Sequence, residues 1–111
     1  MSRSPEQAAK NESAFRRANE RLEDKAADFG FAEERTPYLC ECEDESCMKI
    51  VFLARVQYEE VRAGPKRFLM IPGHQGADDL VVQEEADFVV IEKRGEEGAL
   101  VAGQNPRSPA A

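Results

Sequence analysis

Three closely spaced cysteines and a single histidine are the features of this sequence that most restrict its fold. One residue separates Cys40 from Cys42, four separate Cys42 from Cys47, and His74 follows 27 positions after Cys47. Zinc prefers four thiolate or imidazole ligands in a tetrahedron. Three ligands from one short segment also lower the chain entropy lost when the site closes. We therefore predict one structural zinc ion bound by Cys40, Cys42, Cys47 and His74.

The ligand spacing leaves other interpretations open. Structural zinc sites use Cys-x2-Cys pairs more often than the Cys-x-Cys pair found here. Free cysteines are often simply buried, although the acidic residues at 41–45 favour an exposed turn. Three cysteines and one histidine also bind certain two-iron clusters, but there the histidine follows the third cysteine within a few residues. His74 alone, directly after Pro72-Gly73, would more often be an ordinary loop residue.

The length of 111 residues is that of one domain, and no internal repeat indicates a second. We expect a flexible N-terminus at 1–10, a single zinc-stapled domain at 11–102 and a disordered tail at 103–111. A domain of this size buries a limited share of its surface, so its stability is marginal. A bound metal would therefore matter for folding.

The N-terminal region has the pattern of an amphipathic helix. Ser4-Pro5-Glu6-Gln7 is a good helix start, a second start is available at Asn11, and Gly30 is a plausible stop. Between them, apolar residues recur at steps of three and four, which places them on one helical stripe. This stripe consists of Phe15, Ala18, Leu22, Ala26 and Phe29. We expect it to pack on a sheet while the charged residues, including Arg16 and Glu23, face solvent.

Several later segments are rich in β-branched and aromatic residues and are bounded by turn formers, as β-strands are. A short helix is predicted over 54–63, because Gly64-Pro65 cannot continue it. The result is an α+β fold with an N-terminal amphipathic helix, a short inserted helix and a mainly antiparallel sheet stapled by the zinc site. The predicted strands are 38–40, 48–53, 68–71, 80–83 and 88–91, and a further strand is expected at 99–102 after a turn at 93–98.

The distribution of charge disfavours some classes of partner. The net charge is -7, and residues 1–28 carry six basic and six acidic groups, so the whole excess of negative charge lies in residues 29–111. Nucleic acids and anionic membranes bind clustered Lys and Arg, and that region offers only Lys66-Arg67. No apolar stretch is long enough to cross a bilayer or to form a secretory signal. We expect a cytoplasmic protein whose partner is another protein, and no small-molecule substrate is evident.

Enzymatic activity is not favoured by these motifs. Four protein ligands would close the zinc site, whereas catalytic zinc keeps a position for water. No nucleophile elbow, phosphate-binding glycine loop or dinucleotide fingerprint is present. We therefore expect a non-enzymatic interaction or regulatory module. A thiol redox sensor is the alternative, as is a small metal-dependent hydrolase with Glu41, Glu43 or Glu45 as its base.

A resemblance supports treating the cysteines and the histidine as one unit. From residue 12 to about 107 the chain resembles a family of small, uncharacterised bacterial proteins with a Cys-x-Cys-x4-Cys and Pro-Gly-His pattern. Ile91 is an extra residue against that family's strand ending. The resemblance implies the metal constellation and says nothing of substrate or partner. The residues that carry it are Phe15-Arg16-Arg17-Ala18-Asn19-Glu20, Leu39-Cys40-Glu41-Cys42, Cys47, Gln57-Tyr58-Glu59-Glu60-Val61-Arg62, Arg67-Phe68, Pro72-Gly73-His74 and Val89-Val90-Ile91-Glu92-Lys93.

Overall fold

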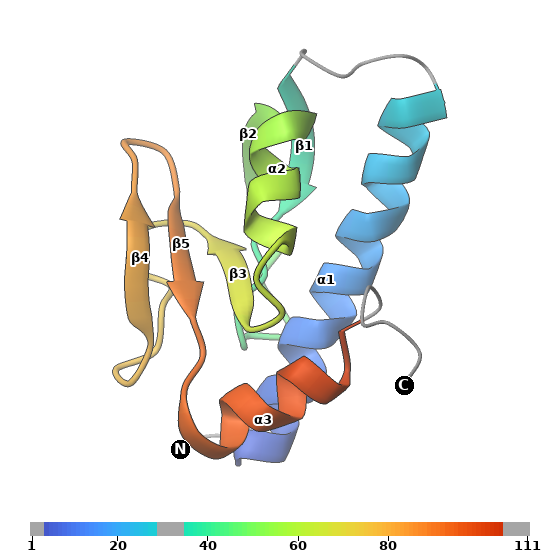
Figure 1. Cartoon of the computed structure of the whole chain (residues 1–111). Helices are drawn as coiled ribbons and strands as arrows, with labels where there is room; N and C mark the ends of the chain where they lie inside the picture. The colour runs from blue at the N-terminus through green and yellow to red at the C-terminus, as the bar shows by residue number, and fades with distance from the viewer. Residues whose placement is uncertain (1–3, 29–34, 106–111) are drawn as a thin grey trace.

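The structure, a computed structural model, describes residues 4–28 and 35–105 (Figure 1). In this part of the chain, β1 pairs with β2, and a second sheet has the order β3-β5-β4; every pairing is antiparallel. The predicted α+β fold is therefore confirmed, with two small sheets. The elements are α1 (Pro5–Asp28), β1 (Arg35–Leu39), β2 (Ile50–Ala54), α2 (Arg55–Arg62), β3 (Arg67–Met70), β4 (Leu80–Glu84), β5 (Val89–Glu92) and α3 (Gly95–Gly103).

The sheet that contains β3 and β5 has apolar side chains packed on both faces. Because side chains alternate along a strand, Phe68 of β3 enters one apolar cluster and its neighbour Leu69 enters another. The first cluster also contains Val101 of α3 and all three cysteines. The second contains Tyr38 and Tyr58, whose stacked rings have centroids 4.3 Å apart. The cysteine-bearing loop is thus part of the hydrophobic core.

The predicted solvent exposure of Arg16 and Glu23 on α1 is wrong, because this helix buries a polar face. The Arg16 guanidinium is fully buried and donates hydrogen bonds to the carbonyl groups of Pro65 (2.9 Å) and Val101 (2.7 Å). Main-chain acceptors that the rest of the fold leaves open therefore offset the desolvation of this charge. The buried polar residues of α1 with an exposed fraction of 3% or less are Glu12, Ser13, Arg16, Asn19 and Glu23.

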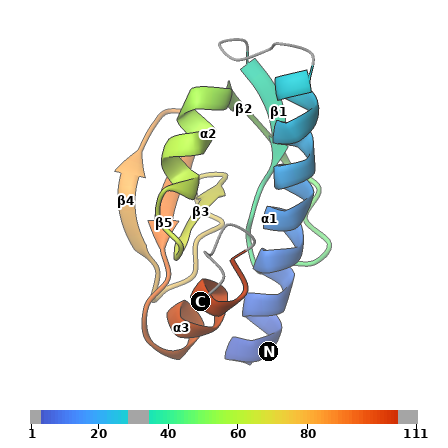
Figure 2. The ribbon, with the colours of Figure 1, turned by 45° about the vertical axis from the view of Figure 1, so that its right-hand side comes forward.

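The predicted apolar stripe of α1 is only half-buried where it is described. Phe15 and Ala18 have intermediate exposure, and Leu22 packs against the second apolar cluster. The side chains of Ala26 and Phe29, and the expected stop at Gly30, lie outside the described residues. Figure 2 shows how α1 runs beside β1, so that one side of the helix borders the strand and the rest of the core.

The chain ends are more structured than the expected boundaries at 11 and 102. Helix α1 begins at Pro5, and Ala8 and Ala9 are buried, so residues 5–10 belong to the domain rather than to a flexible N-terminus. At the other end, α3 includes Gly103, and the Ser13 hydroxyl donates a hydrogen bond to Gln104 (2.6 Å). The rest of the expected tail, 106–111, lies outside the described residues.

The strand expected at 99–102 is wrong, because these residues form most of α3. Glu96 and Glu97 occupy the first turn, where negative charge favours a helix, and Ala and Leu are good helix formers. A short apolar run is compatible with either a strand or a buried helix segment, and its periodicity does not distinguish them. Burial of Val101 against the first apolar cluster decides in favour of the helix (Figures 1 and 2).

Candidate metal centre

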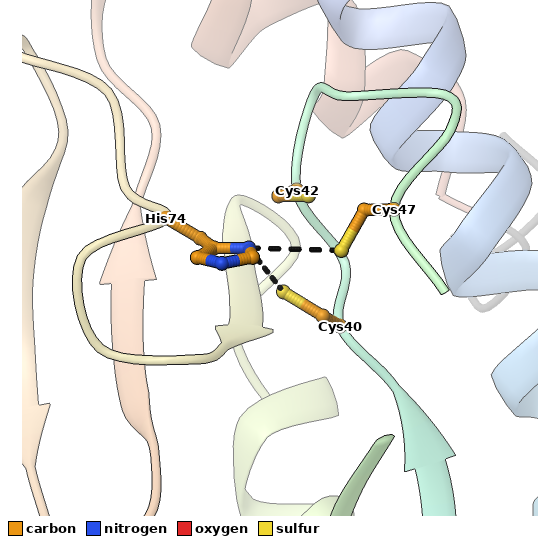
Figure 3. A group of neighbouring side chains, drawn as sticks. All are labelled: Cys40, Cys42, Cys47 and His74. Carbon is orange, nitrogen blue, oxygen red and sulfur yellow. Dashed lines mark hydrogen bonds between the residues drawn. The ribbon is translucent and has the colours of Figure 1, made fainter. Parts of the chain in front are cut away.

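The structure brings the four predicted ligands together from two loops (Figure 3). Cys40, Cys42 and Cys47 lie in the loop between β1 and β2, and His74 reaches them from the loop between β3 and β4. The Nδ1 atom of His74 is 3.6 Å from the sulfur of Cys40 and 3.6 Å from that of Cys47. All four ligand atoms lie within 4.8 Å of one another.

These separations fit a tetrahedral metal ion. Zinc bonds of about 2.3 Å to sulfur and about 2.0 Å to nitrogen place sulfur and nitrogen roughly 3.5 Å apart in a tetrahedron. The observed sulfur-to-nitrogen distances of 3.6 Å are close to that value. The cluster formed by Cys40, Cys42, Cys47 and His74 can therefore hold a metal ion without rearrangement of the two loops.

Backbone hydrogen bonds fold the cysteine loop around the site. The Cys40 amide donates to the Lys49 carbonyl (3.0 Å), which extends the pairing of β1 and β2 beyond the strands. The Asp44 side chain accepts from both the amide (3.0 Å) and the hydroxyl (2.7 Å) of Ser46, as in an Asx turn. The Asp44 carbonyl accepts from the Cys47 amide (3.0 Å). The acidic turn therefore returns Cys47 towards Cys40 and Cys42.

A glycine with a left-handed backbone places the histidine. Gly73 has φ of 95°, a conformation that L side chains rarely adopt. Its amide donates to the Gln75 side chain (2.8 Å), and the His74 amide donates to the Ile71 carbonyl (3.0 Å). This tight turn after β3 carries the half-buried imidazole towards the sulfurs.

The expectation that the cysteines sit in an exposed turn is wrong. Cys40, Cys42 and Cys47 have exposed fractions of 1%, 2% and 7%. A hydrogen bond from Cys40 lowers the pKa of the Cys42 thiol to about 5, and the same contact raises the pKa of Cys40. Burial raises the pKa of Cys47. The Cys40 sulfur also accepts a hydrogen bond from the Ile71 amide (3.3 Å), a contact that favours negative charge on sulfur.

Glu41 is a buried residue of this loop that the sequence interpretation placed among solvated acids. Strand-like alternation turns its side chain away from the neighbouring cysteines, and it is 0% exposed. Its carboxylate accepts hydrogen bonds from the Tyr58 hydroxyl (2.6 Å), the Asn19 amide group (2.9 Å) and the Leu69 backbone amide (2.9 Å). Burial raises the pKa of Glu41, although these hydrogen bonds lower it. The Cys-Glu-Cys alternation was the available signal for this opposite orientation.

A second group of acidic residues surrounds a lysine rather than open space. Oxygens of Glu12, Glu43 and Glu97 lie within 4.8 Å of one another. The buried Lys93 ammonium forms ion pairs with Glu12, with Glu97 (2.8 Å) and with Asp79 (2.8 Å). Lys93 thus supplies the cation at this point. Sequence analysis missed this network because its members come from α1, α3 and two separate loops.

No family model, curated protein or solved structure matches this chain. The resemblance to small bacterial proteins therefore stays a prediction. No helix within residues 4–28 and 35–105 combines the length and apolar character needed to cross a membrane.

Proposed function

We propose that this chain is a zinc-stabilised, non-enzymatic protein-interaction module in which one zinc ion staples the loop between β1 and β2 to the loop between β3 and β4. The observation that carries the proposal is the convergence of three sulfurs and one imidazole nitrogen, with both measured sulfur-to-nitrogen distances at 3.6 Å. Fold and metal binding would then be one property.

The chemistry of the ligands supports zinc over other ions. Thiolates and imidazole suit a borderline-soft, tetrahedral ion, whereas calcium and magnesium prefer oxygen ligands. Three thiolates and one neutral imidazole would leave a net charge of about -1 at the site. The Ile71 amide, which already donates to the Cys40 sulfur, would offset part of that charge.

The surroundings of the cluster favour a structural over a catalytic role. All four tetrahedral positions would be occupied by protein ligands, which leaves no position for a reactive water. The oxygens of Glu41, one of the bases considered for a hydrolase, are engaged by Tyr58, Asn19 and Leu69 on the far side of the loop. A redox sensor needs accessible sulfurs, whereas these three are nearly buried.

The energetic consequence of the proposal is large. Binding of a structural zinc contributes on the order of 10 kcal/mol at neutral pH, which is comparable to the whole stability of a small domain. Loss of the ion would also leave three thiols crowded within the first apolar cluster. We expect the metal-free chain to lose the packing between the cysteine loop and β3.

The test is elemental analysis combined with thiol titration on the purified full-length chain. We expect one zinc per chain, three thiols that react only after chelation, and a sharp fall in the melting temperature when the metal is removed. Cobalt substitution should give the absorption of a tetrahedral site with sulfur ligands. His74→Ala should weaken metal binding, whereas Gln75→Ala, a change in the adjacent residue, should not.

Other results would replace the proposal. Iron with acid-labile sulfide would indicate a cluster instead of zinc. A zinc-bound water with hydrolytic turnover would support the hydrolase. Zinc release by mild peroxide, reversed by a thiol reductant, would support the redox sensor. A melting curve that is unchanged after complete metal removal would exclude a structural role for any ion.

A further inference from the structure

The outer face of the β1–β2 pair exposes a row of large apolar side chains. Met48, Ile50 and Phe52 alternate with inward-facing residues and have exposed fractions of 72%, 43% and 52%. Across the pair, Leu39 lies opposite Ile50 and Pro37 lies opposite Phe52. One side of this small sheet is therefore core and the other side is apolar surface, where a soluble protein normally places polar residues.

Helix α1 turns this apolar face into a groove. Ala18, Arg21 and Leu22 of the helix line a hollow of about 340 Å³ whose other wall is formed by Pro37, Leu39 and Ile50. Both ribbon views show α1 beside β1 along this edge (Figures 1 and 2). Asn19 fixes the two elements together, since its side chain accepts from the Leu39 amide (2.7 Å) and donates to the Leu39 carbonyl (2.8 Å). The groove is thus a built feature of the fold.

The rim of the groove is basic, in contrast to the net charge of -7 of the whole chain. Lys10, Arg17, Arg21 and Lys25 are exposed and follow one another at steps of seven, four and four residues, so they form one stripe along α1. None of the ion pairs found in the described ranges 4–28 and 35–105 involves them. Their charges remain available to a partner.

We propose that this groove, with its basic stripe, docks an acidic segment of another protein that carries apolar side chains between its carboxylates. This proposal deepens the interaction role suggested above and rests on it. The apolar side chains would enter the hollow beside Ile50 and Phe52, and the carboxylates would pair with Arg17 and Arg21. A concave wall in a strongly acidic chain suits such a segment better than a flat, anionic membrane surface.

The test is selection of short random peptides from a display library on the zinc-loaded full-length chain. We expect the enriched peptides to combine Asp or Glu with apolar residues. A synthetic copy of one enriched peptide should shift the NMR signals of Ile50, Phe52 and Arg21. The double variant R17E/R21E, and separately Phe52→Ser, should weaken its binding by about tenfold or more.

Matched variants separate this surface from the rest of the molecule. Lys66→Glu reverses an exposed charge away from the stripe, and Val81→Ser removes an exposed apolar side chain on β4; neither should change peptide affinity. Every variant should keep one zinc per chain and its melting temperature. Loss of zinc from the wild-type chain would count against the proposed function instead of this surface.

Four results would overturn the docking proposal. They are no enrichment at all, enrichment of basic peptides, NMR shifts confined to β4, or equal binding by R17E/R21E. Dimerisation that Phe52→Ser abolishes would make a second copy the occupant. Binding to vesicles of anionic phospholipid that R17E/R21E abolishes, without peptide binding, would assign the face to a membrane.

Discussion

The carboxylate of Glu41 lies 2.6 Å from the hydroxyl group of Tyr58, which donates a hydrogen bond to it inside the core. Glu41 stands between two candidate metal ligands, and Tyr58 belongs to α2, so this contact fixes the cysteine loop to a helix of the second apolar cluster. The same carboxylate reaches α1 through Asn19 and β3 through Leu69. The geometry of the candidate site is therefore held from behind by a buried acid.

Replacement of Glu41 by alanine should destabilise the protein by about 3 kcal/mol or more, because three buried donors would lose their acceptor. Urea denaturation at saturating zinc measures this effect. Glu41→Gln should be much milder, since the amide oxygen can still accept a hydrogen bond. Glu45→Ala, in the exposed part of the same turn, should change stability little. Equal effects of the changes at 41 and 45 would contradict the anchoring role.

Arg16→Ala should cost about 3 kcal/mol, whereas Arg17→Ala at the adjacent exposed position should be nearly neutral. Burial lowers the pKa of Arg16 to about 10, so the group stays charged at neutral pH. Its guanidinium lies 4.5 Å from the ring centroid of Phe68 and donates to two main-chain carbonyl groups. Denaturation of the two variants side by side is the measurement. A neutral Arg16→Ala would show that the buried polar face of α1 is not required.

Gly73→Ala should destabilise the protein by about 1 kcal/mol and weaken zinc binding, because φ of 95° strains any L side chain. No heavy atom lies within 4 Å of the added Cβ, so the cost is conformational rather than steric. Gly103→Ala is the matched control: it also adds a Cβ in open space, but within a helix. Competition with a zinc chelator would report the change in affinity, and equal affinities would sever the link between this turn and the imidazole.

Glu12 should make the protein less stable as the pH rises from 6 to 9. Burial, together with a hydrogen bond to Glu97, raises its pKa from 4.5 to about 10, although Lys93 lowers it. In this range the folded chain holds a proton that the unfolded chain has released, so stability falls by up to about 1.4 kcal/mol per pH unit. Asp79 and Glu43 complete the charged surroundings of this group.

The Glu12→Gln variant isolates this contribution. Zinc binding by thiols has its own pH dependence, so both proteins should be compared at saturating zinc. We expect the difference in stability between wild type and Glu12→Gln to shift steadily in favour of the variant from pH 6 to pH 9. Parallel pH profiles would mean that Glu12 is ionised in the folded chain and pairs with Lys93 as a simple ion pair.

Local sequence patterns predicted most of the elements but not the face that each one buries. The strands at 68–71, 80–83 and 88–91 and the helix at 54–63 correspond to β3, β4, β5 and α2 within a few residues. Their signals are local, because β-branched runs, turn formers and Gly64-Pro65 act over short distances. The run at 99–102 was ambiguous for the same reason: only its packing against α1 and Phe68 distinguishes helix from strand.

The sequence by itself determined the donor types, the clustering of three cysteines and the α+β class, because residue chemistry and short-range periodicity are properties of the chain alone. Only the tertiary structure decided that His74 comes within 3.6 Å of two sulfurs and that Glu41 turns into the core. It also decided that α1 buries Arg16. A buried polar group is stable only where distant parts of the chain supply its hydrogen-bond partners, and the spacing of residues along a sequence does not encode such partners.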